Sequence, residues 1–321
     1  MLIKFILIIL FSAAVLAGGA WLVFGPVENK DRPIVFTVTK DQNTVDVILK
    51  LKEQNLIKNK EAFGFLYLIF AKNKQILPGG YRLNKNLNAW QVLQKITSRP
   101  DLVWVTVPEG SRKEQIGELL AKALDWNESE QKKWNDTYTQ VKQEYIEGVY
   151  FPDTYLIPRD EGGQAITQRF INNFNEKFAP YLPKFAQKNI LWTTGIKIAS
   201  LIQREAAGAE DMPLISGIIW NRLEKGMKLE IDATLQYIRG KTDEGWWGKV
   251  YLSDKQVDSP YNTYIYKGLP PHPIANPGLT AIEAALNPAE TNCLYYLHDS
   301  NKQIHCAKTY EEHQENIRKF L

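Results

Sequence analysis

The stretch GIKIASLIQREAAG, residues 195–208, predicts a core helix that carries a carboxylate. Its apolar residues recur at the spacing of an amphipathic helix. Glu205 continues the same stripe, whose other members are Ile198, Leu201 and Ile202. A carboxyl group facing a core loses hydration, so its pKa should rise and it can hold a proton near neutral pH, as a general acid must. The alternative is a glutamate at the edge of the apolar face whose head reaches water.

The residues that follow predict a helical hairpin beside Glu205. Asp211 is expected to cap a helix with Pro213 in its first turn, and Gly226 is expected to end it. Asp232 is expected to cap a second, shorter helix, or to belong to a binding site. Both helices would pack against the helix of Glu205.

Composition and charge narrow the possible functions. The chain has 321 residues, of which 44% are apolar, enough for a sizeable core and roughly two or three domains. The net charge of +3 is too small to indicate a nucleic-acid partner. The histidines show no HExxH spacing, and Leu235 stands where a phosphate loop before Lys241 would need glycine. We therefore expect neither a metal nor a nucleotide cofactor.

The N-terminus predicts a membrane anchor. Residues 5–24 contain no charged side chain and match the thickness of a bilayer as a helix. Residues 1–4 would form the cytoplasmic end, because Lys4 marks that side, and residues 25–34 a polar linker. The rest of the chain would lie on the periplasmic, extracytoplasmic side of the inner (cytoplasmic) membrane. The alternative is a cleaved signal peptide, although the apolar run is longer than is usual for one.

Residues 35–125 predict small α/β modules, because a strand, a turn and a helix follow one another twice. Ser111 and Glu114 are spaced as the capping box of the second module. The layout resembles LysM-like units, which bind cell-wall glycan, and plain scaffolding modules are the alternative. Helices of this region are expected to bury Val45, Ile48 and Leu49, and then Trp90, Leu93 and Ile96. Residues 126–145 predict a surface helix and a domain boundary, and residues 146–321 a separate domain.

The last segment of that domain predicts a β-hairpin. In CLYYLHDSNKQIHC, the sequence DSNK is typical of a turn between two strands. If the hairpin is centred between Asp299 and Ser300, Cys293 and Cys306 face each other. In an oxidising compartment they could form a disulfide, which would contribute about 3 kcal/mol in the chain-entropy model. Two reduced, packed thiols are the alternative.

A loop rich in proline and glycine precedes the hairpin, in SPYNTYIYKGLPPHPIANPGL. Such a loop is stiff, so it loses little entropy when it shapes a groove. Its polar side chains and tyrosine ring suit a ring-shaped polar ligand such as a sugar. They are Asn262, Thr263, Tyr264 and Asn276. A rigid structural loop that binds nothing is the alternative.

Five motifs together resemble the YceG-like endolytic murein transglycosylases over essentially the whole chain. They are EGVYFPDTY, ASLIQREA, NRLEKGM, SPYNTY and GLPPHPIANPGL. The resemblance implies an α+β fold: an N-terminal transmembrane helix, LysM-like modules, and a mainly helical catalytic domain that ends in a β-hairpin. The sequence departs from the usual family pattern at Arg204, Ala233 and His272, where Lys, Pro and Gly, respectively, are more common.

The resemblance implies that Glu205 is the catalytic residue. It would protonate the leaving oxygen of the β-1,4 bond between N-acetylmuramic acid and N-acetylglucosamine, and then take the proton of the C6 hydroxyl as that oxygen closes onto C1. The product within the peptidoglycan strand would be a 1,6-anhydro end. The implied partners are peptidoglycan glycan strands and glycan synthases of the same membrane.

The expected substrate-binding residues come from these motifs and, for Asp232 and Thr234, from the stretch between NRLEKGM and SPYNTY. These are Glu147, Asp153, Asn221, Arg222, Asp232, Thr234, Asn262, Thr263, Tyr264 and Asn276. Two other functions remain open. One is a muramidase that hydrolyses the same bond with Asp153 or Asp232 as its second carboxylate. The other is a non-catalytic protein that binds the cell wall or serves as a scaffold for its synthesis.

Overall fold

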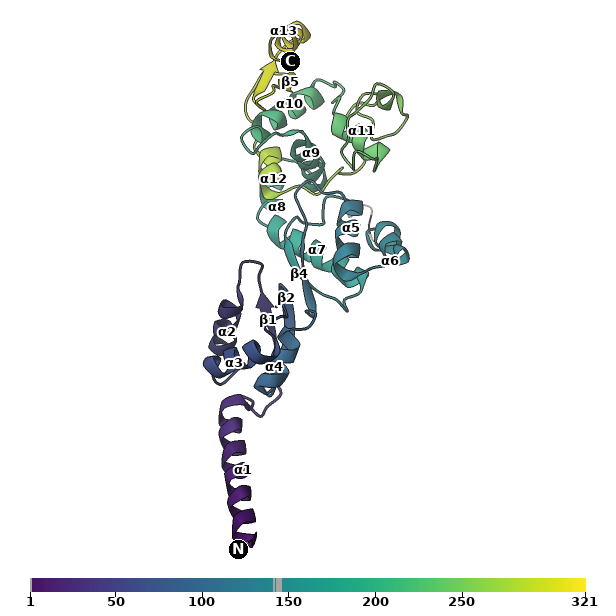
Figure 1. Cartoon of the computed structure of the whole chain (residues 1–321). Coiled ribbons are helices and arrows are strands. Elements are labelled where there is room, and N and C mark those ends of the chain that lie inside the picture. The colour runs from purple at the N-terminus through teal and green to yellow at the C-terminus, as the bar shows by residue number, and fades with distance from the viewer. Residues whose placement is uncertain (1, 141, 143–145) are drawn as a thin grey trace. The chain divides into compact units, whose positions relative to one another are not determined.

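The computed structural model describes residues 2–140, 142 and 146–321, and the chain forms two compact units (Figure 1). Unit 1 comprises Met1–Val105 and Tyr155–Glu161, and unit 2 comprises Thr106–Thr154 and Gly162–Leu321. The segment 126–145, expected to hold a domain boundary, therefore lies within unit 2. Residues 141 and 143–145 of that segment are outside the described residues.

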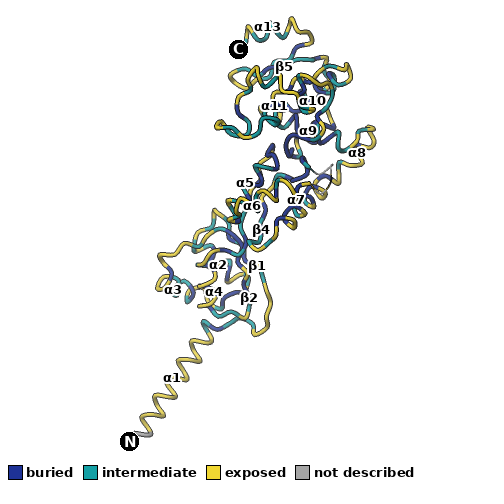
Figure 2. The backbone as a smooth tube through the Cα atoms, turned by 90° about the vertical axis from the view of Figure 1, so that its right-hand side faces the viewer, coloured by how far each residue is buried: buried dark blue, intermediate teal, exposed yellow. Residues whose placement is uncertain are grey.

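Unit 1 begins with the helix α1, Leu2–Phe24. Within its stretch Lys4–Phe24, the most apolar 18 consecutive residues have a mean hydropathy of 2.5, and none of them is buried. Figure 2 colours almost the whole of α1 as exposed. The length and composition of this helix are those of a membrane span.

A four-stranded sheet forms the body of unit 1, in the order β1-β2-β3-β4. Strands β1 and β2 are antiparallel, with Val35 opposite Arg82. The elements in chain order are β1 Pro33–Val38, α2 Thr44–Glu53, α3 Lys60–Phe70, β2 Gly79–Asn84, α4 Ala89–Ile96, β3 Leu102–Thr106 and β4 Thr154–Pro158. The two expected modules are not separate repeats, because β3 joins the sheet of β1 and β2. The helix expected to follow β3, α5 (Lys113–Leu124), belongs to unit 2.

The core of unit 1 differs in detail from the expected one. Asn43 and Asp46 form a capping box that fixes where α2 begins, and the helix then buries Val47 and Leu51. Val45 and Leu49, by contrast, are 65% and 38% exposed, whereas Ile48 is partly buried and packs against the core as expected. In α4, Leu93 and Ile96 are buried as expected, whereas Trp90 is 41% exposed.

Unit 2 is mainly helical, and α9 packs against four of its other helices, α8, α10, α11 and α12. Its elements after α5 are α6 Glu128–Lys133, the π-helix η1 Trp134–Tyr138, α7 Gly163–Phe178, α8 Leu182–Gln187, α9 Trp192–Glu205, α10 Met212–Glu224, α11 Asp232–Arg239, the 3-10 helix η3 Asp254–Gln256, α12 Leu279–Leu286, β5 Tyr295–His298, β6 Ile304–Ala307 and α13 Tyr310–Phe320. The apolar stripe predicted for α9 is confirmed, because Ile198, Leu201 and Ile202 are fully buried.

Two local predictions near the start of unit 2 are wrong. Ser111 does not cap α5, because its hydroxyl donates to the Pro108 carbonyl; Gln115 accepts the backbone N–H of Arg112 instead. Nor is the segment after α5 a surface helix throughout. Trp134 is fully buried, and its indole N–H donates to the carbonyl of Lys113 at 2.9 Å.

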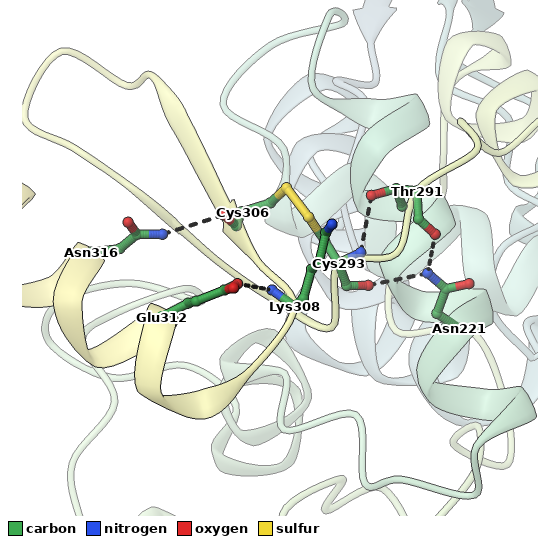
Figure 3. The surroundings of a disulfide bond; sticks show 7 residues. All are labelled: Asn221, Thr291, Cys293, Cys306, Lys308, Glu312 and Asn316. Carbon is green, nitrogen blue, oxygen red and sulfur yellow. Dashed lines mark hydrogen bonds between the residues drawn. A yellow bond between two sulfur atoms is a disulfide. The ribbon is translucent and has the colours of Figure 1, made fainter.

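The C-terminal hairpin forms with a different register from the predicted one. Strands β5 and β6 place Tyr296 opposite Cys306, so Cys293 precedes the paired residues. The loop between the strands has five residues and is held by the Asp299 carboxylate, which accepts the backbone N–H groups of Asn301 and Gln303. Cys293 and Cys306 are nonetheless joined in a disulfide, with 5.9 Å between their Cα atoms (Figure 3).

Candidate functional site

Glu205 is the last residue of α9, the helix that unit 2 packs around. The helix ends there because Ala206 takes an extended conformation. Glu205 is a half-buried residue, and its Oε2 accepts a hydrogen bond of 2.6 Å from the hydroxyl of Tyr296. The backbone N–H of Ala233, in the first turn of α11, also donates to this carboxylate. Three segments that are distant in the sequence therefore meet at one carboxyl group.

The pKa of Glu205 is raised above its ordinary value. Burial is the main cause, and the negative charge of Asp232 adds to it. The hydrogen bonds from Tyr296 and Ala233, together with the proximity of His298, act in the opposite direction. A desolvated carboxyl group with a raised pKa can donate a proton to a bound substrate and take one back.

Tyr296 lies on β5 and was not among the residues predicted from the sequence. Burial and the neighbouring Glu205 raise its pKa well above 10, so its hydroxyl stays protonated and acts as a donor. Two positions along the same strand, His298 pairs with Asp211 at 3.0 Å. Asp211 occupies the N-cap position of α10, as predicted, but its side chain makes no cap hydrogen bond. The sequence signal was the alternation in LYYLH, which places Tyr296 and His298 on one face of a strand.

Asp232 and Tyr264 form the other side of the Glu205 environment. Asp232 is exposed and is the first residue of α11; the cap position expected for it is occupied by Ile231. The hydroxyl of Tyr264 donates to Asp232 Oδ1 at 2.6 Å. Burial, followed by this contact with Asp232, raises the pKa of Tyr264. These two predicted residues are thus brought together next to Glu205.

Three more of the predicted residues are buried beneath this pair. The hydroxyls of Thr234 and Thr263 lie 3.0 Å apart, and Thr263 Oγ1 accepts the backbone N–H of Ile231. The amide of Asn262 donates to the carbonyls of Lys255 and Val257, and its oxygen accepts the N–H of Tyr264. These contacts fasten the SPYNTY loop to the start of α11, and so fix Tyr264 against Asp232.

Asn221 and Arg222, near the end of α10, hold the hairpin that carries Tyr296. The Asn221 amide donates to the carbonyls of Thr291 and Cys293 (Figure 3). The Nε of Arg222 donates to the carbonyl of Leu294 at 2.6 Å, and its Nη1 donates to the carbonyl of Leu229. The disulfide joins the two arms of the hairpin next to these bonds. Both residues are therefore placed to position Tyr296.

Glu147 and Asn276 belong to a different cluster of unit 2. The fully buried Glu147 accepts the N–H of Lys113 and the amide of Asn276, the latter at 2.6 Å. Burial, with the nearby charge of Glu114 as a smaller cause, raises the pKa of Glu147 to about 8. Asp153 lies elsewhere on the surface, where it accepts the amide of Asn173.

The three departures from the family pattern have distinct surroundings. The guanidinium of Arg204 lies 3.9 Å from the ring centroid of Trp247. Ala233 keeps a backbone N–H that proline would lack, and this N–H donates to Glu205. His272 lines a cavity of about 190 Å³ with Glu147, and its Nδ1 lies 2.8 Å from the hydroxyl of Tyr261.

Across residues 2–140, 142 and 146–321, no group of three or more His, Cys, Asp or Glu side chains is placed to hold a metal ion.

Comparison with known proteins places these features in a family. The model of the YceG-like family matches residues 36–319. A protein named endolytic murein transglycosylase from Bacillus subtilis (strain 168) is 31% identical, over 95% of this chain and 91% of that protein. A protein of the same name from Streptococcus pneumoniae serotype 2 is 25% identical, over 90% of this chain but 58% of its own length. A crystal structure of a yceG-like protein from Listeria monocytogenes has a TM-score of 0.61 at 25% identity and covers 89% of this chain and 99% of its own. The chain therefore belongs to the YceG-like family.

Proposed function

We propose that this protein is an endolytic murein transglycosylase, a lytic enzyme that cuts peptidoglycan glycan strands, with Glu205 as its catalytic acid and base. The observation that carries the proposal is the Glu205 carboxyl at the end of α9, whose pKa is raised by burial and which accepts the hydroxyl of Tyr296. The names of the B. subtilis and S. pneumoniae relatives support the same reaction.

The hydrogen bond from Tyr296 fixes which oxygen reacts. Because the Tyr296 hydroxyl donates to Oε2, the acidic proton of Glu205 is carried by Oε1. Oε1 gives this proton to the glycosidic oxygen as the bond from C1 of N-acetylmuramic acid breaks. Glu205 then takes the proton of the C6 hydroxyl while O6 bonds to C1. No water is consumed, and the enzyme returns to its starting protonation state.

The residues around Glu205 have different roles in this proposal. Asp232 and Tyr264, one exposed and the other partly so, contact the glycan. The buried groups act by positioning, because their polar atoms already bond to the protein. These are Arg222, Thr234, Asn262, Thr263 and, in the second cluster, Glu147 and Asn276; the half-buried Asn221 acts in the same way.

The location of the enzyme is also a proposal. We place α1 as a single-pass anchor in the cytoplasmic membrane and the rest of unit 1, with unit 2, outside it, where they can reach nascent strands and the synthases that make them. The disulfide supports an oxidising compartment, since disulfides rarely persist in the cytosol. The order β1-α2-α3-β2 supports a LysM-like unit that binds the same glycan.

The test is digestion of purified glycan strands by the full chain and by Glu205→Gln, with product masses as the readout. We expect anhydro products from the wild type and none from the variant, while Glu210→Gln, which changes an exposed carboxylate nearby, stays active. Products heavier by one water would mean hydrolysis, with Asp232 as the second carboxylate. An active Glu205→Gln would refute the proposed role of Glu205.

A further inference from the structure

Helix α3 presents an apolar face to solvent. Phe65, Leu68 and Ile69 are spaced to lie on one side of the helix, and they are 64%, 61% and 53% exposed. We call these three residues the α3 face. The opposite side of the helix holds unit 1 together, because Phe63 is buried in its core. Helix α3 is therefore apolar on both sides, which a fully solvated surface helix is not.

The apolar surface continues beyond the α3 face to α4. Phe70, in the last turn of α3, is 56% exposed, and its ring meets that of Trp90 edge-on with centroids 5.1 Å apart. An exposed tryptophan beside exposed aliphatic side chains is typical of membrane interfaces, where its ring lies among apolar chains and its N–H reaches water.

The end of α1 packs against this same region of unit 1. Lys58, just before α3, donates through Nζ to the carbonyl of Trp21 in α1 at 3.3 Å. A cavity of about 300 Å³ is lined by residues of both parts, among them Trp21, Phe24, Leu66 and Trp90. Hence, where α1 leaves a bilayer, its last turns bring α3 and α4 to the surface of that bilayer.

The charges around α3 suit an anionic lipid surface. Lys58 precedes the helix, Lys60 is its first residue, and Lys72 and Lys74 follow it after Ala71. The single acidic residue of the helix, Glu61, lies 3.8 Å from Lys60. Apolar side chains flanked by lysines are the pattern by which helices lie in the plane of a membrane interface.

We propose that the α3 face, with Phe70 and Trp90, inserts into the boundary between lipid headgroups and acyl chains of the bilayer that α1 crosses. Unit 1 then rests on the membrane through two contacts, α1 and α3, rather than on α1 alone. The linker between α1 and β1 supports this, because Glu28 forms an ion pair with Lys85 at 3.1 Å and ties the linker to the body of unit 1.

The test measures the depth of single labelled positions in the full chain. The native cysteines form a disulfide, so an introduced cysteine can be labelled selectively with a polarity-sensitive fluorophore. Leu68→Cys reports on the α3 face, Leu10→Cys on the span, and Lys40→Cys is the matched control. Lys40 lies just beyond the C-terminal end of β1. Because β1 is roughly 20 Å long, Lys40 is far from the linker that joins α1 to the start of this strand. Each variant is placed in two sets of nanodiscs, holding one copy or two, whose lipids carry spin labels at shallow or deep acyl positions.

We expect the shallow spin label to quench Leu68→Cys severalfold more than Lys40→Cys, and the deep label to quench Leu10→Cys most. A Leu68→Cys signal that matches Lys40→Cys would overturn the proposal, and so would the absence of quenching at Leu10→Cys. Shielding of Leu68→Cys only in discs that hold two copies would assign the face to a second copy instead of lipid. The readout does not use glycan cleavage, so it is independent of the proposed activity.

Discussion

Replacing Tyr296 with phenylalanine should shift the pH dependence of glycan cleavage in a calculable direction. The Tyr296 hydroxyl donates to Glu205 Oε2 at 2.6 Å and so favours the ionised carboxylate. Hydrogen bonds to charged groups contribute about 1.5–3 kcal/mol. Each pKa unit corresponds to about 1.4 kcal/mol, so Tyr296→Phe should raise the pKa of Glu205 by roughly one to two units.

The assay is the rate of anhydro-product formation as a function of pH. Only protonated Glu205 can donate, so the rate falls as pH rises through the pKa of this residue. In Tyr296→Phe this alkaline limb should move upward by roughly one to two pH units. Tyr295→Phe is the matched control, because it removes a hydroxyl from the opposite face of the same strand. An unmoved limb in Tyr296→Phe, or an equal shift in Tyr295→Phe, would refute the reasoning.

Three further predictions follow from the same structure. Asp232→Asn removes a negative charge that raises the pKa of Glu205, so the alkaline limb of the rate profile should move to lower pH; an upward shift would contradict this. Replacing both Cys293 and Cys306 by serine should lower the free energy of unfolding by about 3 kcal/mol in chemical denaturation, and an unchanged midpoint would show that the bridge does not stabilise the fold. Burial raises the pKa of Glu147 from 4.5 to about 8, so the folded protein keeps a proton that the unfolded chain releases. The contribution of Glu147 to the free energy of unfolding should therefore be fully present below pH 4.5 and be lost as the pH rises towards 8. Glu147→Gln should abolish that part of the slope, as denaturation at several pH values would reveal.

The sequence predicted the helix of Glu205 because the evidence for it is local. Apolar residues at helical spacing identified the buried stripe of α9, and Pro213 and Gly226 marked the start and the end of α10. The same local patterns failed to predict burial where a neighbouring segment determines which side of a helix faces the core. Trp90 has the right spacing for burial in α4 but is exposed, whereas Trp134 stands in a polar stretch and is fully buried.

The site was predicted in part. The sequence placed Glu205, Asp232 and Tyr264 in one domain, and the tertiary structure brings Asp232 and Tyr264 together beside Glu205. The tertiary structure also places Glu147 in a separate, buried cluster. Motif spacing cannot predict this, because it does not show which polar groups already have hydrogen-bond partners. Tyr296 was missed for a related reason: its contact with Glu205 spans 91 positions and depends on the register of the hairpin.

By itself, the sequence determined the apolar N-terminal helix, the α9 stripe with a carboxylate at its end, and the presence of a C-terminal hairpin, because spacing, capping and turn residues act over a few positions. Only the tertiary structure decided the hairpin register, the assignment of β3 and α5 to different units, and the contact of Tyr296 with Glu205. Those features depend on which distant surfaces exclude water from one another, and the desolvation that raises the pKa of Glu205 is a property of that packing.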